Sequence, residues 1–252
     1  MIRIQDLTFS FPERSVLRDL DLIIDESLTT VVIGASGIGK SVLLKCITGL
    51  LAPEKGSIII DGDEVVGAER NQLRSIRRKT GMLFQEGALF DSMTVFENVA
   101  FPLHYHNLYP TSEIRDRVHA YLDLVGMWEY AHAMPRELSG GMKRKVAVAR
   151  AMILEPHYLL YDEPTAGLDP SSSAVVEAMI MRLQAERSIT SLVVTHDIDL
   201  TRYIADRIAL LEDGHIVALM TREEAFQEGS PVYEHFIENR ERIRQEKVSE
   251  GQ

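Results

Sequence analysis

The sequence predicts a mixed α/β fold, and three patterns along the chain support this prediction. First, the apolar strand Thr29–Ile33 leads directly into a glycine-rich turn and then into an apolar-faced helix. Second, helical periodicity dominates between about residues 94 and 151. Third, strand-like and helical runs alternate from about residue 158 onward. Such alternation is typical of α/β domains.

The amino-terminal part of the chain is predicted to consist mostly of strands. Apolar and polar side chains alternate in the first two, whereas the third is predicted to be a buried strand that ends at a glycine. The predicted strands are Ile2–Phe11, 20–24, Thr29–Ile33, 57–61 and 81–84. A helix is predicted over residues 41–50, closed by Gly49.

The middle of the chain is predicted to form an inserted helical subdomain. One of its helices would begin at Thr111 or Ser112 as the capping residue. The apolar face of that helix would be lined by Ile114, Val118, Tyr121, Leu122 and Val125. Farther along, predicted strands at 158–161, 191–195 and 207–211 alternate with predicted helices at 171–186 and 200–204.

Composition narrows the class of protein. With 252 residues, 45% of them hydrophobic and 26% charged, the chain has the balance of a globular protein with a sizeable core. Its apolar runs are of strand length, well short of the roughly 20 residues that a membrane-spanning helix needs. The formal net charge of -11 argues against a nucleic-acid-binding protein, because that affinity comes from clustered Lys and Arg. The single cysteine, Cys46, fits a reducing compartment. The first residues lack the pattern of a secretory signal, so we expect the chain to stay in the cytoplasm.

The first chemical motif is the glycine-rich turn after Thr29–Ile33. Residues 34–41 read Gly-Ala-Ser-Gly-Ile-Gly-Lys-Ser and match the phosphate-loop pattern G-x-x-x-x-G-K-[ST] between a strand and a helix. Its backbone N–H groups and the helix N-terminus can cradle phosphates. Lys40 is expected to contact the β- and γ-phosphates, and the Ser41 hydroxyl suits Mg²⁺, which prefers oxygen ligands.

The second motif is a pair of carboxylates at the end of an apolar strand. Residues 158–161 are buried-strand residues, and Asp162 and Glu163 follow them directly. In a phosphate-loop site, Asp162 would hold the magnesium shell and Glu163 could activate the attacking water as a general base.

The third motif separates classes of phosphate-loop protein. Residues 138–142 read Leu-Ser-Gly-Gly-Met and precede a predicted helix over 143–153. This run resembles the signature motif of ATP-binding cassette (ABC) proteins. The resemblance extends over about residues 2–225. It implies an ABC-ATPase fold with a RecA-like phosphate-loop core, an antiparallel β subdomain and an inserted α-helical subdomain at about 94–151. It also implies a nucleotide-binding domain over 1–228, followed by a helical extension and charged tail over 229–252.

The resemblance also implies the residues of the site. In the family, an aromatic at Phe11, with Phe9 as the alternative, stacks on adenine, and Gln85 contacts magnesium and water. His196 reaches the γ-phosphate, and the loop 166–169 crosses to the other subunit. The implied nucleotide-binding residues are Phe11, Gly34, Ser36, Gly37, Gly39, Lys40, Ser41, Val42, Ser139, Gly140, Gly141 and Asp169. The implied catalytic residues are Glu163, His196 and Gln85, and the implied magnesium ligands are Ser41, Gln85 and Asp162.

A longer segment indicates a transport system. Residues 81–103, together with Ser-Gly-Ile-Gly-Lys at 36–40 and Met142, resemble the ATPases of Mla-type systems, which move phospholipids between bacterial membranes. The run 87–90 lies where the family docks a coupling helix of its permease. In contrast, the Ala-Gly-Leu run at 166–168 is the common cassette form rather than a specialised loop.

The resemblance implies ATP and Mg²⁺ as cofactors and a head-to-tail homodimer at the cytoplasmic face of the inner membrane. Its implied partners are an integral membrane permease, a small regulatory subunit and a lipid-binding MCE-type protein, with no nucleic acid. The alternatives are an amino-acid or lipoprotein ABC system, a soluble cassette ATPase and a small-molecule phosphoryl transferase. The apolar spacing of Val232, Tyr233, Phe236 and Ile237 predicts a carboxy-terminal helix that packs on its own domain, on the second subunit or on an accessory protein.

Overall fold

The computed structural model describes residues 1–85 and 87–238 and contains two β-sheets. The smaller sheet has the strand order β2-β1-β4-β5 and is antiparallel. Its strands are β1 (Ile2–Phe11), β2 (Arg14–Ile24), β4 (Lys55–Ile60) and β5 (Asp63–Glu64). The larger sheet has the order β10-β9-β3-β8-β7-β6. Its strands are β3 (Thr29–Ile33), β6 (Thr80–Leu83), β7 (Tyr158–Asp162), β8 (Thr190–Thr195), β9 (Arg207–Glu212) and β10 (His215–Thr221).

The larger sheet is parallel except at one edge, where β10 pairs antiparallel with β9. Strand β3 lies inside it and is fully buried, because both faces of the sheet are covered there. Val31 and Ile33 belong to one hydrophobic cluster and Val32 to the other. The first cluster includes helices of the helical region, and the second includes β1, β2 and β4. The predicted α/β fold is therefore confirmed.

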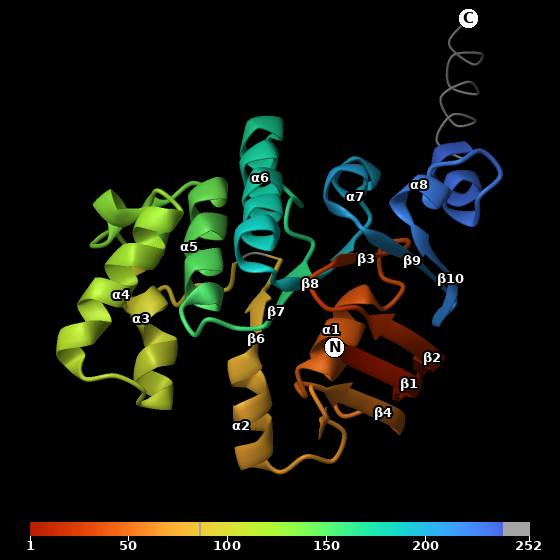
Figure 1. The fold of residues 1–252 in the computed structure, drawn as a ribbon, viewed down its shortest axis with the longest axis horizontal. Helices are drawn as coiled ribbons and strands as arrows, with labels where there is room; N and C mark the ends of the chain where they lie inside the picture. Colours follow the sequence, from red (N-terminus) through yellow and green to blue (C-terminus); the bar gives the residue numbers. More distant parts are fainter. Residues whose placement is uncertain (86, 239–252) are drawn as a thin grey trace, which may run out of the picture.

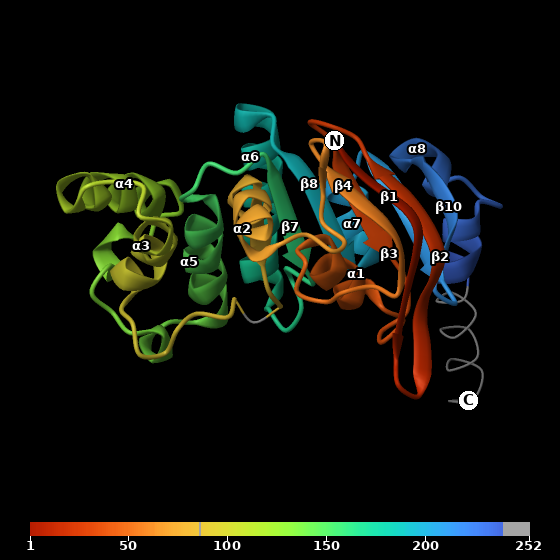
Figure 2. The ribbon, with the colours of Figure 1, turned by 90° about the horizontal axis from the view of Figure 1, so that it is seen from below.

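The α-helices of the described chain follow one another between the strands or at their ends. They are α1 (Lys40–Ile47), α2 (Arg70–Lys79), α3 (Val95–His106), α4 (Thr111–Leu124), α5 (Gly140–Met152), α6 (Pro170–Arg187), α7 (Ile198–Ile204) and α8 (Arg222–Ala225). Short 3-10 turns lie at Trp128–Tyr130 and Pro135–Glu137, and a π-helical turn lies at Tyr233–Glu238. Helices α3 and α4 lie at one end of the molecule, and β10 and α8 lie at the other (Figure 1). The antiparallel sheet lies beside the larger one, on the side of α1 (Figure 2). Within the described residues, every helix falls short of the length and apolarity needed to cross a bilayer.

Some predicted element bounds are wrong. Helix α4 begins at Thr111, and its N-cap is Pro110 in an extended conformation, so neither Thr111 nor Ser112 caps it. Helix α5 begins at Gly140 rather than residue 143, because Ser139 caps it with its side chain. Strand β2 begins at Arg14, well before the predicted residue 20, because it pairs along the length of β1.

The apolar face predicted for the helix after residue 110 is confirmed. Its five residues are all buried: Ile114, Val118, Tyr121, Leu122 and Val125. They join the cluster that also contains Val146 and Met152 of α5. Because α5 also carries the Ser139 motif at its start, this packing links the helical region to a candidate functional element.

The single thiol, Cys46, lies in α1 and is fully buried. Burial raises its pKa from 9.0 to about 12. We expect the native thiol to be unreactive toward Ellman's reagent at pH 8 and to react fully in denaturant. Because the folded pKa lies above the unfolded one, its contribution to stability is present below about pH 9 and is lost as pH rises toward 12. Rapid reaction of the Cys46 thiol with Ellman's reagent in the native protein would contradict the expected lack of reactivity.

The segment after Gly229 packs on its own domain as far as the structure describes it. Val232 is fully buried, in the same cluster as Ala225 and Ile208. Ser230 Oγ donates to the carbonyl oxygen of Ala225 at 2.6 Å. The side chains of Phe236 and Ile237, and residues 239–252 of the predicted charged tail, lie outside the described residues.

We expect a chain truncated after Gly229 to be less stable than the full chain. Loss of the buried Val232 side chain should lower the free energy of unfolding by about 2 kcal/mol, and the melting temperature by several degrees. Thermal unfolding measures this. A chain truncated after Glu238 keeps every described contact and is the control. Equal melting temperatures for the full chain and the Gly229 truncation would show that the segment does not stabilise this domain.

Candidate functional site

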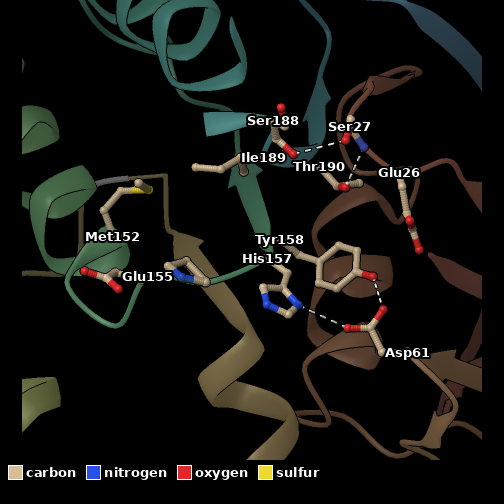
Figure 3. A pocket seen from close by; sticks show the side chains of 11 residues that line it. Glu26, Ser27, Asp61, Met152, Glu155, His157, Tyr158, Ser188, Ile189 and Thr190 are labelled. Carbon is tan, nitrogen blue, oxygen red and sulfur yellow. Dashed lines mark hydrogen bonds and ion pairs between the residues drawn. The ribbon is translucent and has the colours of Figure 1, made fainter. Parts of the chain in front are cut away.

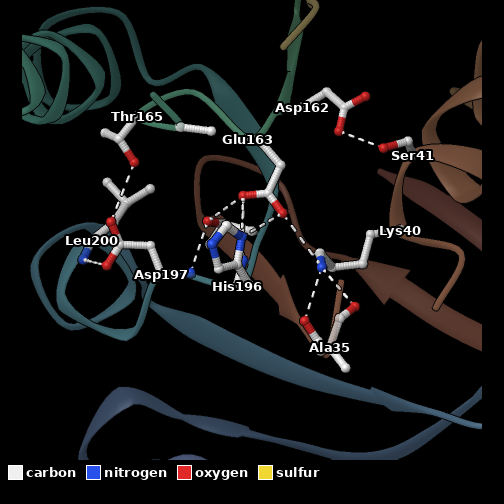
Figure 4. Close-up of polar contacts among 12 residues, drawn as sticks. Ala35, Lys40, Ser41, Asp162, Glu163, Thr165, His196, Asp197 and Leu200 are labelled. Carbon is white, nitrogen blue, oxygen red and sulfur yellow. Dashed lines mark hydrogen bonds and ion pairs between the residues drawn. The ribbon is translucent and has the colours of Figure 1, made fainter. Parts of the chain in front are cut away.

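Three segments from distant parts of the sequence meet at the carboxyl ends of β3, β7 and β8. The loop after β3 is the phosphate loop, Asp162 and Glu163 end β7, and Thr195 and His196 end β8. Figure 4 shows Lys40, Asp162, Glu163 and His196 converging from these strands. Open α/β sheets bind ligands in the crevice outside the carboxyl ends of their parallel strands.

The phosphate loop is shaped by glycines. Gly37 and Gly39 have φ values of 78° and 122°, in the region that favours glycine. A Cβ atom on Gly39 would lie 2.6 Å from Val16 Cγ1, so a larger residue would not fit there. Gly39 is also the N-cap of α1, so the loop delivers the chain directly to a helix N-terminus.

Lys40 is buried, with 5% of the residue exposed, and its ammonium group turns back onto the loop. Nζ donates to the carbonyl oxygens of Gly34 and Ala35 at 2.8 and 3.1 Å. It also lies 3.4 Å from Oε1 of Glu163, in an ion pair. The cation is thus held between the phosphate loop and the end of β7.

Ser41 and Asp162 form the second contact between the loop and β7. Ser41 Oγ donates to Asp162 Oδ1 at 2.7 Å. Burial raises the pKa of Asp162 above its ordinary value, the hydrogen bond from Ser41 opposes this, and the charge of Glu163 adds to it. A hydroxyl and a carboxylate side by side are oxygen ligands suited to a hard divalent cation.

Glu163 carries the most connected carboxylate of the site. Its backbone has a φ of 46°, and its N–H donates to the carbonyl oxygen of Val194 at 2.9 Å. Besides Lys40, the carboxylate contacts Nδ1 of His196 at 3.0 Å and the hydroxyl of Thr195 at 2.9 Å. Its side chain is 12% exposed, whereas that of His196 is 53% exposed. Glu163 is therefore held inside the site, and His196 lies at its surface.

A cavity of about 320 Å³ opens over this cluster. Its lining residues are Phe11, Arg14, Val16, Ser36, Gly37, Gly39, Lys40, Ser41, Val42, Gln85, Glu163 and His196. Phe11 is 48% exposed, while Phe9 is 7% exposed and packs edge-on against it. Of the two aromatics considered for adenine stacking, only Phe11 therefore lines this cavity.

The structure does not bring all the predicted residues together. Ser139, Gly140 and Gly141 start α5, and Asp169 is the N-cap of α6, and none of these four lines the 320 Å³ cavity. The Ser139 side chain accepts a hydrogen bond from the Met142 N–H, and Asp169 accepts two from Ser172. Those from Ser172 lower the pKa of Asp169. Ser139 and Asp169 are exposed, so their polar atoms face solvent.

Arg144 joins these outward-facing elements. It is buried in α5, and its Nε donates to the carbonyl oxygen of Pro164 at 3.1 Å. Its Nη2 donates to the carbonyl oxygen of Ala166, also at 3.1 Å. The helix that begins at Ser139 and the loop that ends at Asp169 are thereby held in one unit.

We expect Arg144→Gln to lower the free energy of unfolding by about 2 kcal/mol, because two carbonyl oxygens beneath α5 lose their charged donor. ATP hydrolysis should fall as well, by up to about 100-fold, since a displacement of about 1 Å can cost that much. Thermal unfolding and phosphate release measure the two effects. Arg136→Gln, at an exposed arginine in the turn before α5, is the control. An Arg144→Gln protein with normal stability and turnover would contradict the expectation.

A larger cavity, of about 590 Å³, lies away from the phosphate loop (Figure 3). It borders the amino-terminal ends of β7 and β8, where Tyr158 and Thr190 begin those strands. Asp61 accepts a hydrogen bond from the Tyr158 hydroxyl and lies 3.3 Å from Nδ1 of His157. This larger cavity lies at the amino-terminal ends of the strands, whereas the phosphate loop and Glu163 lie at the carboxyl ends. We therefore place the candidate site at the smaller cavity.

The sequence motifs did not point to four residues in or beside the site: Arg14, Val16, Thr195 and Arg144. Arg14 lines the cavity and its Nη2 donates to the carbonyl oxygen of Gly37 at 3.2 Å. Thr195 contacts Glu163 from β8, and Arg144 contacts the loop after β7 from α5. For Thr195 a signal exists in its position before His196, whereas Arg14 and Arg144 carry no local signal that separates them from surface arginines.

Comparison with known proteins agrees with this geometry. The family model described as "ABC transporter" matches residues 17–166, more than half of the chain. The chain is 40% identical over 227 residues to the Haemophilus influenzae "intermembrane phospholipid transport system ATP-binding protein MlaF", covering 90% of this chain and 86% of that protein. It is 41% identical over 239 residues to the Mycobacterium tuberculosis "probable ribonucleotide transport ATP-binding protein mkl", covering 95% of this chain and 67% of that protein.

A solved structure supports the same relationship. The dimeric structure of the bacterial ABC transporter cassette MJ0796 superposes with a TM-score of 0.81 at 31% identity, covering 88% of this chain and 99% of that chain. A second structure of that cassette is described as a dimeric post-hydrolysis state bound to ADP and Pi, with a TM-score of 0.80 at 30% identity. The fold, the convergence of the phosphate loop with Asp162, Glu163 and His196, and these similarities together identify the chain as a member of the ABC transporter family, an ATP-hydrolysing ATP-binding subunit.

Proposed function

We propose that this ATPase powers phospholipid transport between the inner and outer membranes of a bacterium, in an Mla-type system. The observation that carries this is the resemblance of residues 81–103 to Mla-type ATPases, together with about 40% identity to proteins named for intermembrane phospholipid transport. In this role the chain would lie at the cytoplasmic face of the inner membrane. It would bind an integral permease and act with a regulatory subunit and an MCE-type lipid-binding protein.

Nucleotide and Mg²⁺ fit the residues at the site. The Ser41 hydroxyl, the Asp162 carboxylate and the exposed Gln85 side chain are the oxygen donors that would hold the metal. When bound, magnesium neutralises charge on the β- and γ-phosphates. Phe11 would stack on adenine, and Lys40 would contact phosphate through the ammonium group that now binds two loop carbonyls. Residues Ser36, Gly37, Gly39 and Val42 would form the cradle.

Glu163 is the group we assign to water activation. Its carboxylate lies in the cavity beside Lys40, and a base within hydrogen-bond reach of the attacking water can take its proton. His196, which contacts the same carboxylate and is more exposed, would reach the γ-phosphate with its other ring nitrogen.

A head-to-tail homodimer accounts for the four predicted residues that lie at the starts of α5 and α6, away from the phosphate loop. Ser139, Gly140, Gly141 and Asp169 lie at two helix N-termini that Arg144 holds together. Helix N-termini bind anions. In a dimer, these elements of one subunit would complete the nucleotide site of the other, in keeping with the solved cassette structures described as dimeric.

The relatives' names point to two cargoes, phospholipid and ribonucleotide. Identity alone does not choose between them, because an ATP-binding subunit need not hold the cargo. The decisive experiment is to purify the complex from its native host through a tag on this chain and to identify its permease and bound molecules by mass spectrometry. A permease with co-purifying phospholipid is the expected result. An amino-acid permease, a lipoprotein-release permease or a bound ribonucleotide would overturn the phospholipid assignment.

A further inference from the structure

The carboxylate of Glu163 contacts three side chains, two of which are also assigned to bind nucleotide phosphates. Lys40 Nζ lies 3.4 Å from Oε1, and His196 Nδ1 lies 3.0 Å from each oxygen. Both are side chains that we assign to nucleotide phosphates. The third partner, Thr195, donates its hydroxyl to Oε2 at 2.9 Å and is fully buried. It does not line the nucleotide cavity.

The direction of the Thr195 hydroxyl is set by a second hydrogen bond. The backbone N–H of Asp197 donates to Thr195 Oγ1 at 3.0 Å. Because the oxygen accepts this bond, its own hydrogen is left to point at Glu163. Asp197 is itself held at the start of α7, where its carboxylate accepts from the N–H groups of Asp199 and Leu200. The orientation of the hydroxyl is thus set by a hydrogen bond from the backbone at the start of α7.

The backbone supports the same contact from the other side. Asp162 pairs with Val194 in the parallel register of β7 and β8, so the residues that follow them lie side by side. Glu163 adopts a φ of 46° at this point and donates its N–H to the carbonyl oxygen of Val194. This conformation turns the Glu163 side chain toward the end of β8, where Thr195 meets it.

We propose that Thr195 is a positioning residue that fixes the carboxylate of Glu163 for water activation. Lys40 and His196 would be drawn toward phosphate when nucleotide binds, whereas Thr195 would keep its hold on Oε2. The inference rests on the proposed role of Glu163 as general base. Its chemistry is that of one hydroxyl donor orienting a charged acceptor in a site sheltered from water.

The test compares Thr195→Val, which has the same shape without the hydroxyl, with Thr195→Ser, which keeps the hydroxyl. In the full-length chain, Thr195→Val should lower kcat for ATP hydrolysis by roughly 10-fold to 100-fold while the affinity for ATP stays unchanged. Thr195→Ser should restore most of the rate. Thr29→Val is the matched control, since Thr29 is a fully buried β3 threonine whose hydroxyl has no hydrogen-bond partner among the described residues. It should keep wild-type kcat.

A double-mutant comparison distinguishes positioning from general damage to the fold. In a Glu163→Gln background, adding Thr195→Val should cause no further loss of the residual rate, because the group that Thr195 positions has been removed. An additional loss of similar size in that background would overturn the proposal, and so would wild-type kcat in Thr195→Val. The general-base role of Glu163 is tested separately by the single variant: normal turnover in Glu163→Gln alone would contradict that role.

Discussion

Replacing Glu163 by Gln should nearly abolish ATP hydrolysis while leaving ATP binding intact. Glutamine keeps the shape of the side chain and can still accept the hydrogen bond from Thr195, but it cannot take a proton from water. General-base catalysis contributes about 10² to 10⁴-fold, so kcat should fall by that order. Phosphate release measures turnover, and equilibrium binding of a fluorescent ATP analogue measures affinity.

The same variant should also accumulate as an ATP-dependent dimer. If ATP completes the interface between two subunits and hydrolysis separates them, a chain that binds without hydrolysing remains paired. Size-exclusion chromatography with light scattering, with and without Mg-ATP, tests this. Glu186→Gln, at an exposed carboxylate of α6 that pairs with Arg182, is the matched control and should behave as wild type. Retained turnover in Glu163→Gln would show that another group is the base.

Replacing Lys40 by Ala should have its largest effect on the affinity for ATP, before hydrolysis takes place. The Lys40 ammonium group is held within the phosphate loop, and we assign it to the β- and γ-phosphates. Charge-assisted contacts of this kind are among the strong ones in proteins. Loss of a buried, hydrogen-bonded charge costs about 2 to 5 kcal/mol, so ATP affinity should fall by at least about 30-fold.

Calorimetric titration with Mg-ATP measures the affinity of Lys40→Ala. The melting temperature of this variant should also be measured, because the substitution removes the ion pair between Lys40 and Glu163 and could change stability. Lys55→Ala, at an exposed lysine of β4, provides the control for removal of a positive charge. An unchanged affinity in a folded Lys40→Ala protein would contradict the role assigned to the ammonium group.

Several features of this protein were determined by short stretches of its sequence. The strand, turn and helix around the phosphate loop are set by local chemistry: an apolar run, glycines that can take positive φ, and a helix that starts at Lys40. The apolar face that begins at Ile114 depends only on helical spacing, and its burial confirms it. The signature run around Ser139 was likewise recognisable from adjacent residues. These features could be predicted because they depend on neighbours within a few positions.

The errors arose where the end of an element depended on a particular side chain or on a distant strand. Ser139 caps α5 and so moves its start to Gly140, into the signature run itself. Strand β2 extends back to Arg14 because β1 offers pairing partners along that length. Periodicity marks the middle of an element well, but its ends depend on which backbone groups find hydrogen-bond partners.

The class of chemistry can be recognised from short runs of residues, since the phosphate loop, the paired carboxylates and the signature run each lie within a few consecutive positions. Which partners hold those residues in place depends on the folded arrangement of strands and helices. Thr195 and Glu163 are 32 positions apart and meet because β7 and β8 pair in parallel register. Arg144 reaches Pro164 across 20 positions because α5 packs above the loop after β7. Contacts of this kind depend on strand order and packing, which no short run of residues encodes.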